Sequence, residues 1–148
     1  MRLYLDVCCL NRPFDDPTQE RVRLESEAVL TILERCQRKS FTLLTSEIVD
    51  YEIGRIPDGD RKQKLRSLKS ISRVYIMVTD VIVGRSVELS ELGFRAYDAL
   101  HIACAEKGRA DVFLTTDDSL LKRAAADMKA LMVQVENPVR WVLQEVIR

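Results

Sequence analysis

The chain has 148 residues, of which 47% are hydrophobic and 31% charged, and its formal net charge is zero. This composition is that of one folded domain rather than of a disordered segment, and without a net charge any contact with nucleic acid has to come from a local patch. No apolar stretch approaches the ~20 residues of a transmembrane helix and no signal peptide is apparent, so we expect a cytoplasmic protein.

Apolar runs alternate with helical patterns from one end of the chain to the other. Most of the runs are short and continuously apolar, which is typical of parallel strands buried on both faces of a sheet. The strands expected from them are Leu3–Val7, Phe41–Thr45, Val74–Val78, Val112–Thr115 and Leu131–Val135.

The segments between these strands carry apolar residues at helical spacing. The expected helices cover residues 18–38, 46–54, 61–70, 79–92 and 95–107, then about eight residues after Asp117 or Asp118, and a last stretch that begins at Asn137-Pro138. Asn137 suits an N-cap, Pro138 a first helical turn and Gly108 a C-terminal cap. Repeated β–α alternation without a linker predicts one domain over residues 1–148, a three-layer α/β/α sandwich with a mainly parallel central sheet.

Four acidic residues stand where an α/β domain usually has its active site. Asp6 follows the first apolar run, Asp117 follows the run 112–114, and Glu52 and Asp98 lie in expected helices. Carboxylates that follow adjacent parallel strands converge at the carboxyl edge of the sheet, where such folds bind ligands. Clustered carboxylates repel one another unless a hard divalent cation neutralises them, and Mg²⁺ or Mn²⁺ fits oxygen ligands. The pattern therefore predicts a metal site and phosphate chemistry.

Each acid also has a structural interpretation. Asp6 suits a turn in which its side chain bonds nearby backbone amides. Glu52 shares the inward face of its helix with Ile48, where an unpaired carboxylate would pay a desolvation cost. Asp98 stands in a first helical turn, where the helix dipole favours an anion.

The pair Asp117-Asp118 can divide two roles, one as helix N-cap and one as site residue. We expect Asp118 to be the cap and Asp117 to face the sheet edge, although the two could exchange. His101 is the only histidine and follows Asp98 by three residues on the same helix face. A lone histidine beside apolar residues is more often a core or supporting group than a catalytic one.

A run of basic residues has two interpretations. It comprises Arg61, Lys62, Lys64, Arg66, Lys69 and Arg73, with no acid among them. It is either a solvated helix face or the wall of a groove that attracts a phosphate backbone. Arg12 and Arg55 each follow an acidic element and could reach the same ligand.

These positions resemble the PIN domain, the nuclease fold typical of the toxin component of bacterial VapBC toxin–antitoxin pairs. The resemblance covers nearly the whole chain, and the segments that carry it are Leu5-Asp6, Ser46-Glu47-Ile48-Val49-Asp50-Tyr51-Glu52-Ile53, Asp98-Ala99-Leu100-His101-Ile102-Ala103-Cys104-Ala105 and Leu114-Thr115-Thr116-Asp117. Asp98-Ala99-Leu100-His101 is the most specific of them. One departure is Cys8, since many members have Asn or Ser two residues after the first aspartate; here Asn11 comes further on.

The resemblance implies roles for residues of this chain. It implies that Asp6, Glu52, Asp98 and Asp117 bind the metal, with Thr115, Thr116, Asp118 and Asn11 as auxiliary polar groups. It also implies an Mg²⁺- or Mn²⁺-dependent ribonuclease that forms a homodimer and is silenced by a cognate antitoxin. The residues expected to contact RNA are Arg12, Arg55, Arg61, Lys62 and Lys64.

The function expected is endonucleolytic hydrolysis of RNA that leaves a 5′-phosphate and a 3′-hydroxyl. One alternative is an RNA-binding or assembly module that kept the fold and lost the chemistry. Another is an aspartyl-phosphate phosphatase or receiver domain, which Cys8 disfavours because such phosphatases need a second aspartate there. Nucleotide-binding enzymes are disfavoured because no glycine-rich phosphate loop occurs.

Overall fold

A five-stranded parallel sheet forms the middle layer of the fold. The computed structural model describes residues 1–147, and its strands follow the spatial order β3-β2-β1-β4-β5. All four strand pairs in these residues are parallel. The strands are β1 (Arg2–Leu5), β2 (Thr42–Ser46), β3 (Val74–Ile76), β4 (Val112–Leu114) and β5 (Gln134–Glu136).

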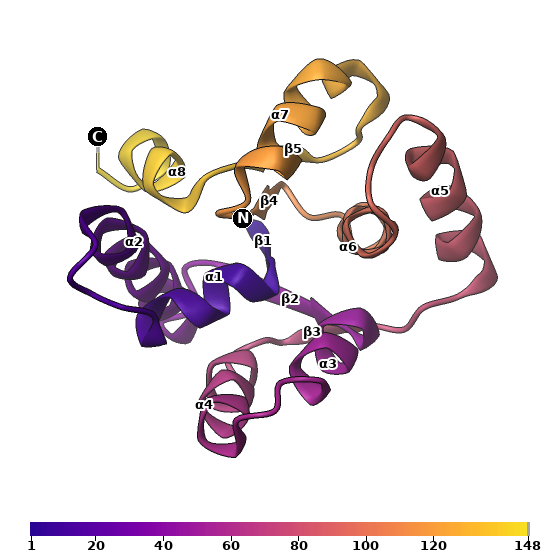
Figure 1. Ribbon diagram of the computed structural model, residues 1–148. Helices are drawn as coiled ribbons and strands as arrows, with labels where there is room; N and C mark the ends of the chain where they lie inside the picture. Colours follow the sequence, from indigo (N-terminus) through magenta and orange to yellow (C-terminus); the bar gives the residue numbers. More distant parts are fainter. Residues whose placement is uncertain (148) are drawn as a thin grey trace.

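Helices cover both faces of this sheet. Figure 1 shows α2 and α8 on one side of the strands and α5 and α6 on the other, and the expected three-layer α/β/α sandwich is confirmed. The helices are α1 (Val7–Asn11), α2 (Glu20–Gln37), α3 (Glu47–Gly54), α4 (Gly59–Lys69), α5 (Asp80–Glu91), α6 (Ala96–Lys107), α7 (Asp118–Ala126) and α8 (Pro138–Glu145), with 3₁₀ turns η1 (Arg12–Phe14) and η2 (Met128–Ala130).

The strand order reverses direction at β1. From β1 the chain moves outward to β2 and β3, then returns to the other side of β1 for β4 and β5. Leu5 of β1 pairs with Leu114 of β4, so these two strands end side by side. The carboxyl ends of strands at such a reversal leave a crevice, which is where open α/β sheets bind ligands.

Short polar side chains start these helices, and in α8 the cap is the predicted Asn137. Ser46 Oγ accepts a hydrogen bond from the Val49 amide of α3, and Asn137 Oδ1 accepts one from Val139 with Pro138 in the first turn of α8. Such caps satisfy amides that the first helical turn leaves without a partner.

Gly108 ends α6 as expected, but for a reason of packing. Its φ is −78°, and the left-handed residue is Arg109 with φ of 57°. A Cβ on Gly108 would stand 2.5 Å from Leu44 Cδ2 and 2.8 Å from Ile76 Cδ1. A larger residue would force the Leu44 and Ile76 side chains or α6 to move, so the glycine allows helix and sheet to lie close together.

Several predicted boundaries were wrong by two to three residues. The first strand ends at Leu5 because Asp6 already caps α1, which contains Val7. The last strand is Gln134–Glu136 rather than 131–135, since pairing with β4 places Gln134 opposite Val112. The helix expected over residues 18–38 begins at Glu20, and the basic helix begins at Gly59, capped by Asp58.

The apolar runs form the core, as continuous burial on both faces predicts. Every residue of Leu3–Leu5 and Val112–Leu114 is buried. Tyr4 stacks on Phe113 with ring centroids 5.3 Å apart. Among the described residues, no helix is both long and apolar enough to span a bilayer.

Candidate active site

The four predicted acids line one cleft. This cleft has a volume of about 440 Å³, and its walls include Asp6, Glu52, Asp98 and Asp117. They come from the end of β1, from α3, from α6 and from the turn between β4 and α7. Asn11 and Cys8 also line it, whereas Thr116 and Asp118 do not. The structure thus brings together residues up to 111 positions apart in the chain, at the crevice where the strand order reverses.

Asp6 is held by donors on both of its carboxylate oxygens. Its Oδ1 accepts the Val7 amide over 2.8 Å, and its Oδ2 accepts the Thr115 hydroxyl over 2.8 Å. The Cys8 thiol donates to Oδ2 over 3.4 Å. Asp6 is 7% exposed, so these bonds stabilise a charge that burial would otherwise disfavour. Cys8 therefore supplies a weak donor to Asp6, although it is neither Asn nor Ser.

Asp117 both caps a helix and lines the cleft, although the sequence prediction gave the cap to Asp118. It is the N-cap of α7, and its Oδ1 accepts the amides of Ser119 over 2.9 Å and Leu120 over 3.2 Å. The expectation that Asp118 is the cap was wrong: Asp118 is already helical, is exposed, and pairs with Arg21 over 2.7 Å. Only Asp117 has the extended backbone that a cap needs. Its Oδ2 remains available to the cleft.

Glu52 is positioned by a buried chain of hydrogen bonds. Its Oε1 bonds Nε2 of His101, whose Nδ1 is 2.7 Å from the Tyr4 hydroxyl. That hydroxyl is 2.6 Å from Ser46 Oγ. Burial opposes a charged imidazole, but the bond to Glu52 and the nearby Asp6 raise the pKa of His101 above its usual value. His101 is 1% exposed with both ring nitrogens engaged, so it supports the site rather than meeting a substrate.

Asp98 is the acid whose protonation is most perturbed. Burial, with repulsion from Asp6 and Asp117, raises its pKa to about 6, against weaker attraction from His101 and Arg95. Within residues 1–147 no group donates a hydrogen bond to its carboxylate. A half-buried carboxylate without a donor beside two other acids is a site that a cation would stabilise.

The donor set fits a hard divalent cation in the kind of its ligands. Four carboxylates on one cleft match the oxygen preference of Mg²⁺ and Mn²⁺. As the side chains stand, no three acidic, histidine or cysteine residues among positions 1–147 are close enough to share an ion. Asp6, Glu52 and Asp117 each have one carboxylate oxygen bonded to another group of the protein. These bonds account for part of the spacing between the acids.

Two residues of the cleft were missed by the sequence prediction. Arg95 and Tyr97 line the wall beside Asp98, and both are exposed. Arg95 places a positive charge next to the acids, and Tyr97 accepts a hydrogen bond from Arg55 over 3.2 Å. The sequence signal that could have identified Arg95 and Tyr97 is their position just before Asp98, at the start of the same helix.

The basic residues proposed for RNA contact do not line the cleft, and two of them are engaged in the fold. Arg12 bonds Glu25 over 2.8 Å and Asp15 over 3.1 Å. Arg61 bonds Asp15 over 2.9 Å and Asn11 over 3.0 Å. Lys62 and Lys64 lie on the same helix, with Lys64 over the Phe14 ring. Contact of these residues with RNA stays a prediction.

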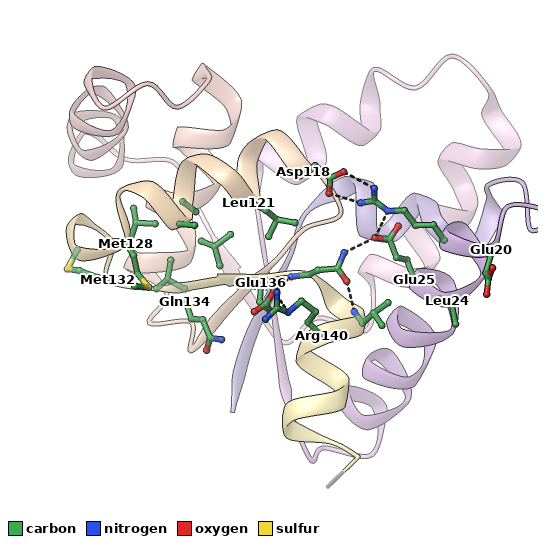
Figure 2. A pocket seen from close by; sticks show the side chains of 18 residues that line it. Glu20, Leu24, Glu25, Asp118, Leu121, Met128, Met132, Gln134, Glu136 and Arg140 are labelled. Carbon is green, nitrogen blue, oxygen red and sulfur yellow. Dashed lines mark hydrogen bonds and ion pairs between the residues drawn. The ribbon is translucent and has the colours of Figure 1, made fainter.

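A larger hollow lies elsewhere on the described surface. It is a groove of about 1120 Å³ between α2, α7, β5 and α8, and its lining includes Leu24, Leu121 and Met128. Figure 2 shows Asp118 and Glu25 at this groove, and Arg21 of α2 pairs with both of them. None of the four predicted acids lines it. Chemistry rather than volume therefore identifies the candidate active site.

Comparison with known proteins gives a family and a fold. Residues 3–126 match the family model described as the PIN domain. FitAcB from Neisseria gonorrhoeae aligns with TM-score 0.57 and 18% identity over 92% of this chain and 97% of that one. VapBC2 from Rickettsia felis, whose structure contains a DNA fragment from its promoter, aligns with TM-score 0.58 and 18% identity over 93% and 98%. PAE2754 from Pyrobaculum aerophilum aligns with TM-score 0.56 and 18% identity over 99% and 98%. No curated protein sequence gave a significant match.

Proposed function

This chain belongs to the PIN domain family, and on that premise we propose that it is an Mg²⁺- or Mn²⁺-dependent endoribonuclease. The observation that carries the proposal is the cleft at the strand reversal that gathers Asp6, Glu52, Asp98 and Asp117. The pKa of Asp98, raised to about 6 by burial and then by repulsion from Asp6 and Asp117, supports it, because that repulsion is what a divalent cation relieves.

The four carboxylates are the residues that would hold the ion. The chemistry that such an ion supplies when bound is activation of water at neutral pH and neutralisation of charge on a phosphate. The alternative of a module without catalysis predicts no affinity for Mn²⁺, which isothermal titration would reveal.

The other side chains around the cleft hold its groups in position and do not exchange protons. Thr115 fixes the carboxylate of Asp6, and His101 fixes that of Glu52. Arg95 places an exposed positive charge on the wall, where it would attract the phosphodiester. Attack by water on phosphorus, with release of the 3′-oxygen of the preceding nucleotide, leaves a 5′-phosphate and a 3′-hydroxyl. His101 is too buried to serve as a general base.

We propose further that the protein is the toxin of a toxin–antitoxin pair, acts in the cytoplasm and forms a homodimer. The likeness in fold to VapBC2 and FitAcB supports an antitoxin partner. A small reading frame of DNA-binding type directly upstream of the gene, whose product co-purifies with this chain, is the expected observation. Absence of such a neighbour would contradict the toxin assignment and leave the nuclease assignment standing.

The test of the nuclease is the Asp98→Asn variant. We expect it to lose cleavage of labelled RNA in Mg²⁺ by on the order of 100-fold or more, because one carboxylate of the cation site is gone. Asp60→Asn is the matched control, since Asp60 is exposed on α4 and away from the cleft. Undiminished cutting by Asp98→Asn would remove the assignment.

A further inference from the structure

A second, smaller pocket adjoins the acidic cleft on the side of α7. It has a volume of about 330 Å³ and lies between the start of α6 and one face of α7. Asp98 and Arg95 line this pocket as well as the cleft. A ligand bound in the cleft can therefore continue into the pocket along the protein surface.

One face of α7 forms a wall of this pocket. The residues of α7 that line it include four at spacings of three and four positions, namely Ser119, Lys122, Arg123 and Ala126. Residues at these spacings lie on the same side of a helix. Ser119 and Ala126 are small, and both Lys122 and Arg123 are exposed. The helix therefore presents two positive charges to the pocket.

The pocket carries more positive than negative charge. Its cations are Arg95, Lys122 and Arg123, and among the described residues that line it the one acid is Asp98. In the part of the chain that the structure describes, the side chains of Arg95 and Lys122 form no ion pair and no hydrogen bond. Because the net charge of the whole chain is zero, this excess is a local patch, which is what attraction of a phosphate backbone requires here.

The turn before α6 holds Arg123 in place. Gly93 has a φ of +108°, and a Cβ on it would stand 3.1 Å from Cζ of Arg123 and 3.2 Å from its Nε. The guanidinium can lie against this backbone because glycine has no side chain there. Its Nη1 is 3.5 Å from Oδ2 of Asp127, and within residues 1–147 its other nitrogens have no partner. These nitrogens stay available to an anion.

We propose that this cationic pocket, formed by Arg95, Lys122 and Arg123, binds the backbone phosphate next to the scissile one. The inference rests on the proposed ribonuclease function and adds a second phosphate site to it. Because cleft and pocket share Asp98 and Arg95, a chain whose scissile phosphate faces the four acids brings a neighbouring phosphate to α7. Such a contact fixes the position of the chain without reading its sequence.

The salt dependence of binding counts phosphate contacts and needs no cleavage. Short fluorescein-labelled RNAs of different sequence are titrated with the full chain in EDTA, at about 50 to 200 mM KCl, and anisotropy is recorded. We expect Lys122→Ala to reduce the slope of log affinity against log salt by about 0.7–1, and to weaken binding by a similar factor for every sequence. Lys122→Arg keeps the charge and should keep the slope.

Lys129→Ala is the matched control. Lys129 is also an exposed lysine, but it lies in η2 and lines neither the pocket nor the cleft. Its replacement removes the same charge from the protein and should leave both the affinity and the slope unchanged. Equal slopes for Lys122→Ala and Lys129→Ala would overturn the proposal. Thermal melts of each variant show whether the fold is retained.

A free phosphate ion is the other source of the same chemistry. Inorganic phosphate might move the amide NMR signals of Ser119 and Lys122 while Lys122→Ala binds RNA as the unaltered chain does. That result would assign the pocket to a free anion and contradict the proposal. Failure of the nuclease assignment has a different signature, because Asp98→Asn would then cut RNA as well as the unaltered chain in Mg²⁺, whatever slopes the Lys122 variants give.

Discussion

The hydroxyl of Thr115 donates a hydrogen bond to Oδ2 of Asp6 over 2.8 Å, across the junction where β4 and β1 end side by side. The oxygen of the same hydroxyl accepts the backbone amide of Asp117 over 3.1 Å. Thr115 is fully buried. One side chain therefore sets the positions of two of the four carboxylates of the cleft.

Removing that hydroxyl should loosen the site and the fold together. Thr115→Val keeps the shape of the side chain but leaves the Asp117 amide without its acceptor and Oδ2 of Asp6 with only the weak Cys8 thiol as donor. We expect the free energy of unfolding in urea to fall by about 1–3 kcal/mol, the cost of buried groups left unsatisfied. Thr115→Ser should recover most of the loss.

Thr116→Val is the control for this experiment. Thr116 is also buried, but in the described chain its hydroxyl makes no hydrogen bond. The change should cost less than about 0.5 kcal/mol. Equal losses in the two valine variants would show that the bond to Asp6 contributes nothing.

Asp98→Asn should stabilise the protein when no cation is present. In the folded chain burial and two neighbouring acids raise the pKa of Asp98 to about 6, whereas the ordinary value is 3.8. Between these values the folded state binds more protons, so the free energy of unfolding falls as the pH rises and stays lower above pH 6. Because solvent screens a partly exposed carboxylate, we expect the gain from asparagine at pH 7.5 to be about 1 kcal/mol.

Thermal melts in EDTA at pH 4 and pH 7.5 check this prediction. A gain of that size should raise the melting temperature by about 2–4 °C at pH 7.5 in a domain of this length. The difference should shrink strongly near pH 4, where Asp98 is protonated in the folded state and already partly protonated in the unfolded state, whose ordinary pKa is 3.8. A variant less stable than the unaltered chain at pH 7.5 would contradict the repulsion, and stabilisation with lost cleavage would separate activity from folding.

His101 should matter to the cation through Glu52. His101→Leu removes the donor that orients the Glu52 carboxylate. We expect Mn²⁺ affinity in isothermal titration to fall by about 10- to 100-fold, as when other supporting partners of metal ligands are lost. His101→Gln, whose amide nitrogen can stand near the place of Nε2, should restore part of it. No difference between the two variants would assign His101 to packing alone.

The buried carboxylate of Glu25 should be worth more to stability than any surface pair. It is 2% exposed and accepts from Arg12 over 2.8 Å, Arg21 over 3.2 Å and Asn137 over 2.7 Å. Glu25→Gln leaves two guanidiniums without their shared charge. Because both arginines are partly open to water, we expect a loss near 2–3 kcal/mol in urea denaturation, below that of a fully buried pair.

Glu27→Gln is the comparison on the same helix. Glu27 pairs with Arg23 over 3.4 Å, and both side chains are exposed. Its loss should be within about 0.5 kcal/mol. Similar losses at positions 25 and 27 would mean that burial does not strengthen the network around Glu25.

The local sequence was enough to predict the sandwich and that the four acids lie on one cleft. Continuous apolar runs such as Val112–Leu114 are buried on both faces, and an acid that follows such a strand has to emerge at the edge of the sheet. Asn137 was recognisable as a cap because a helix start needs an oxygen within a few residues. These signals act over short stretches of chain.

Only the tertiary structure decided which carboxylate oxygen of each acid accepts a hydrogen bond and from which donor. Asp117 rather than Asp118 became the cap, and Arg12 was drawn into a pair with Glu25. The bond from Thr115 to Asp6 joins residues 109 positions apart. No periodicity reveals such a contact, because the pairing of β1 with β4 creates it. Hydrogen bonds and charge repulsion act over a few ångströms in space, whatever the separation along the chain.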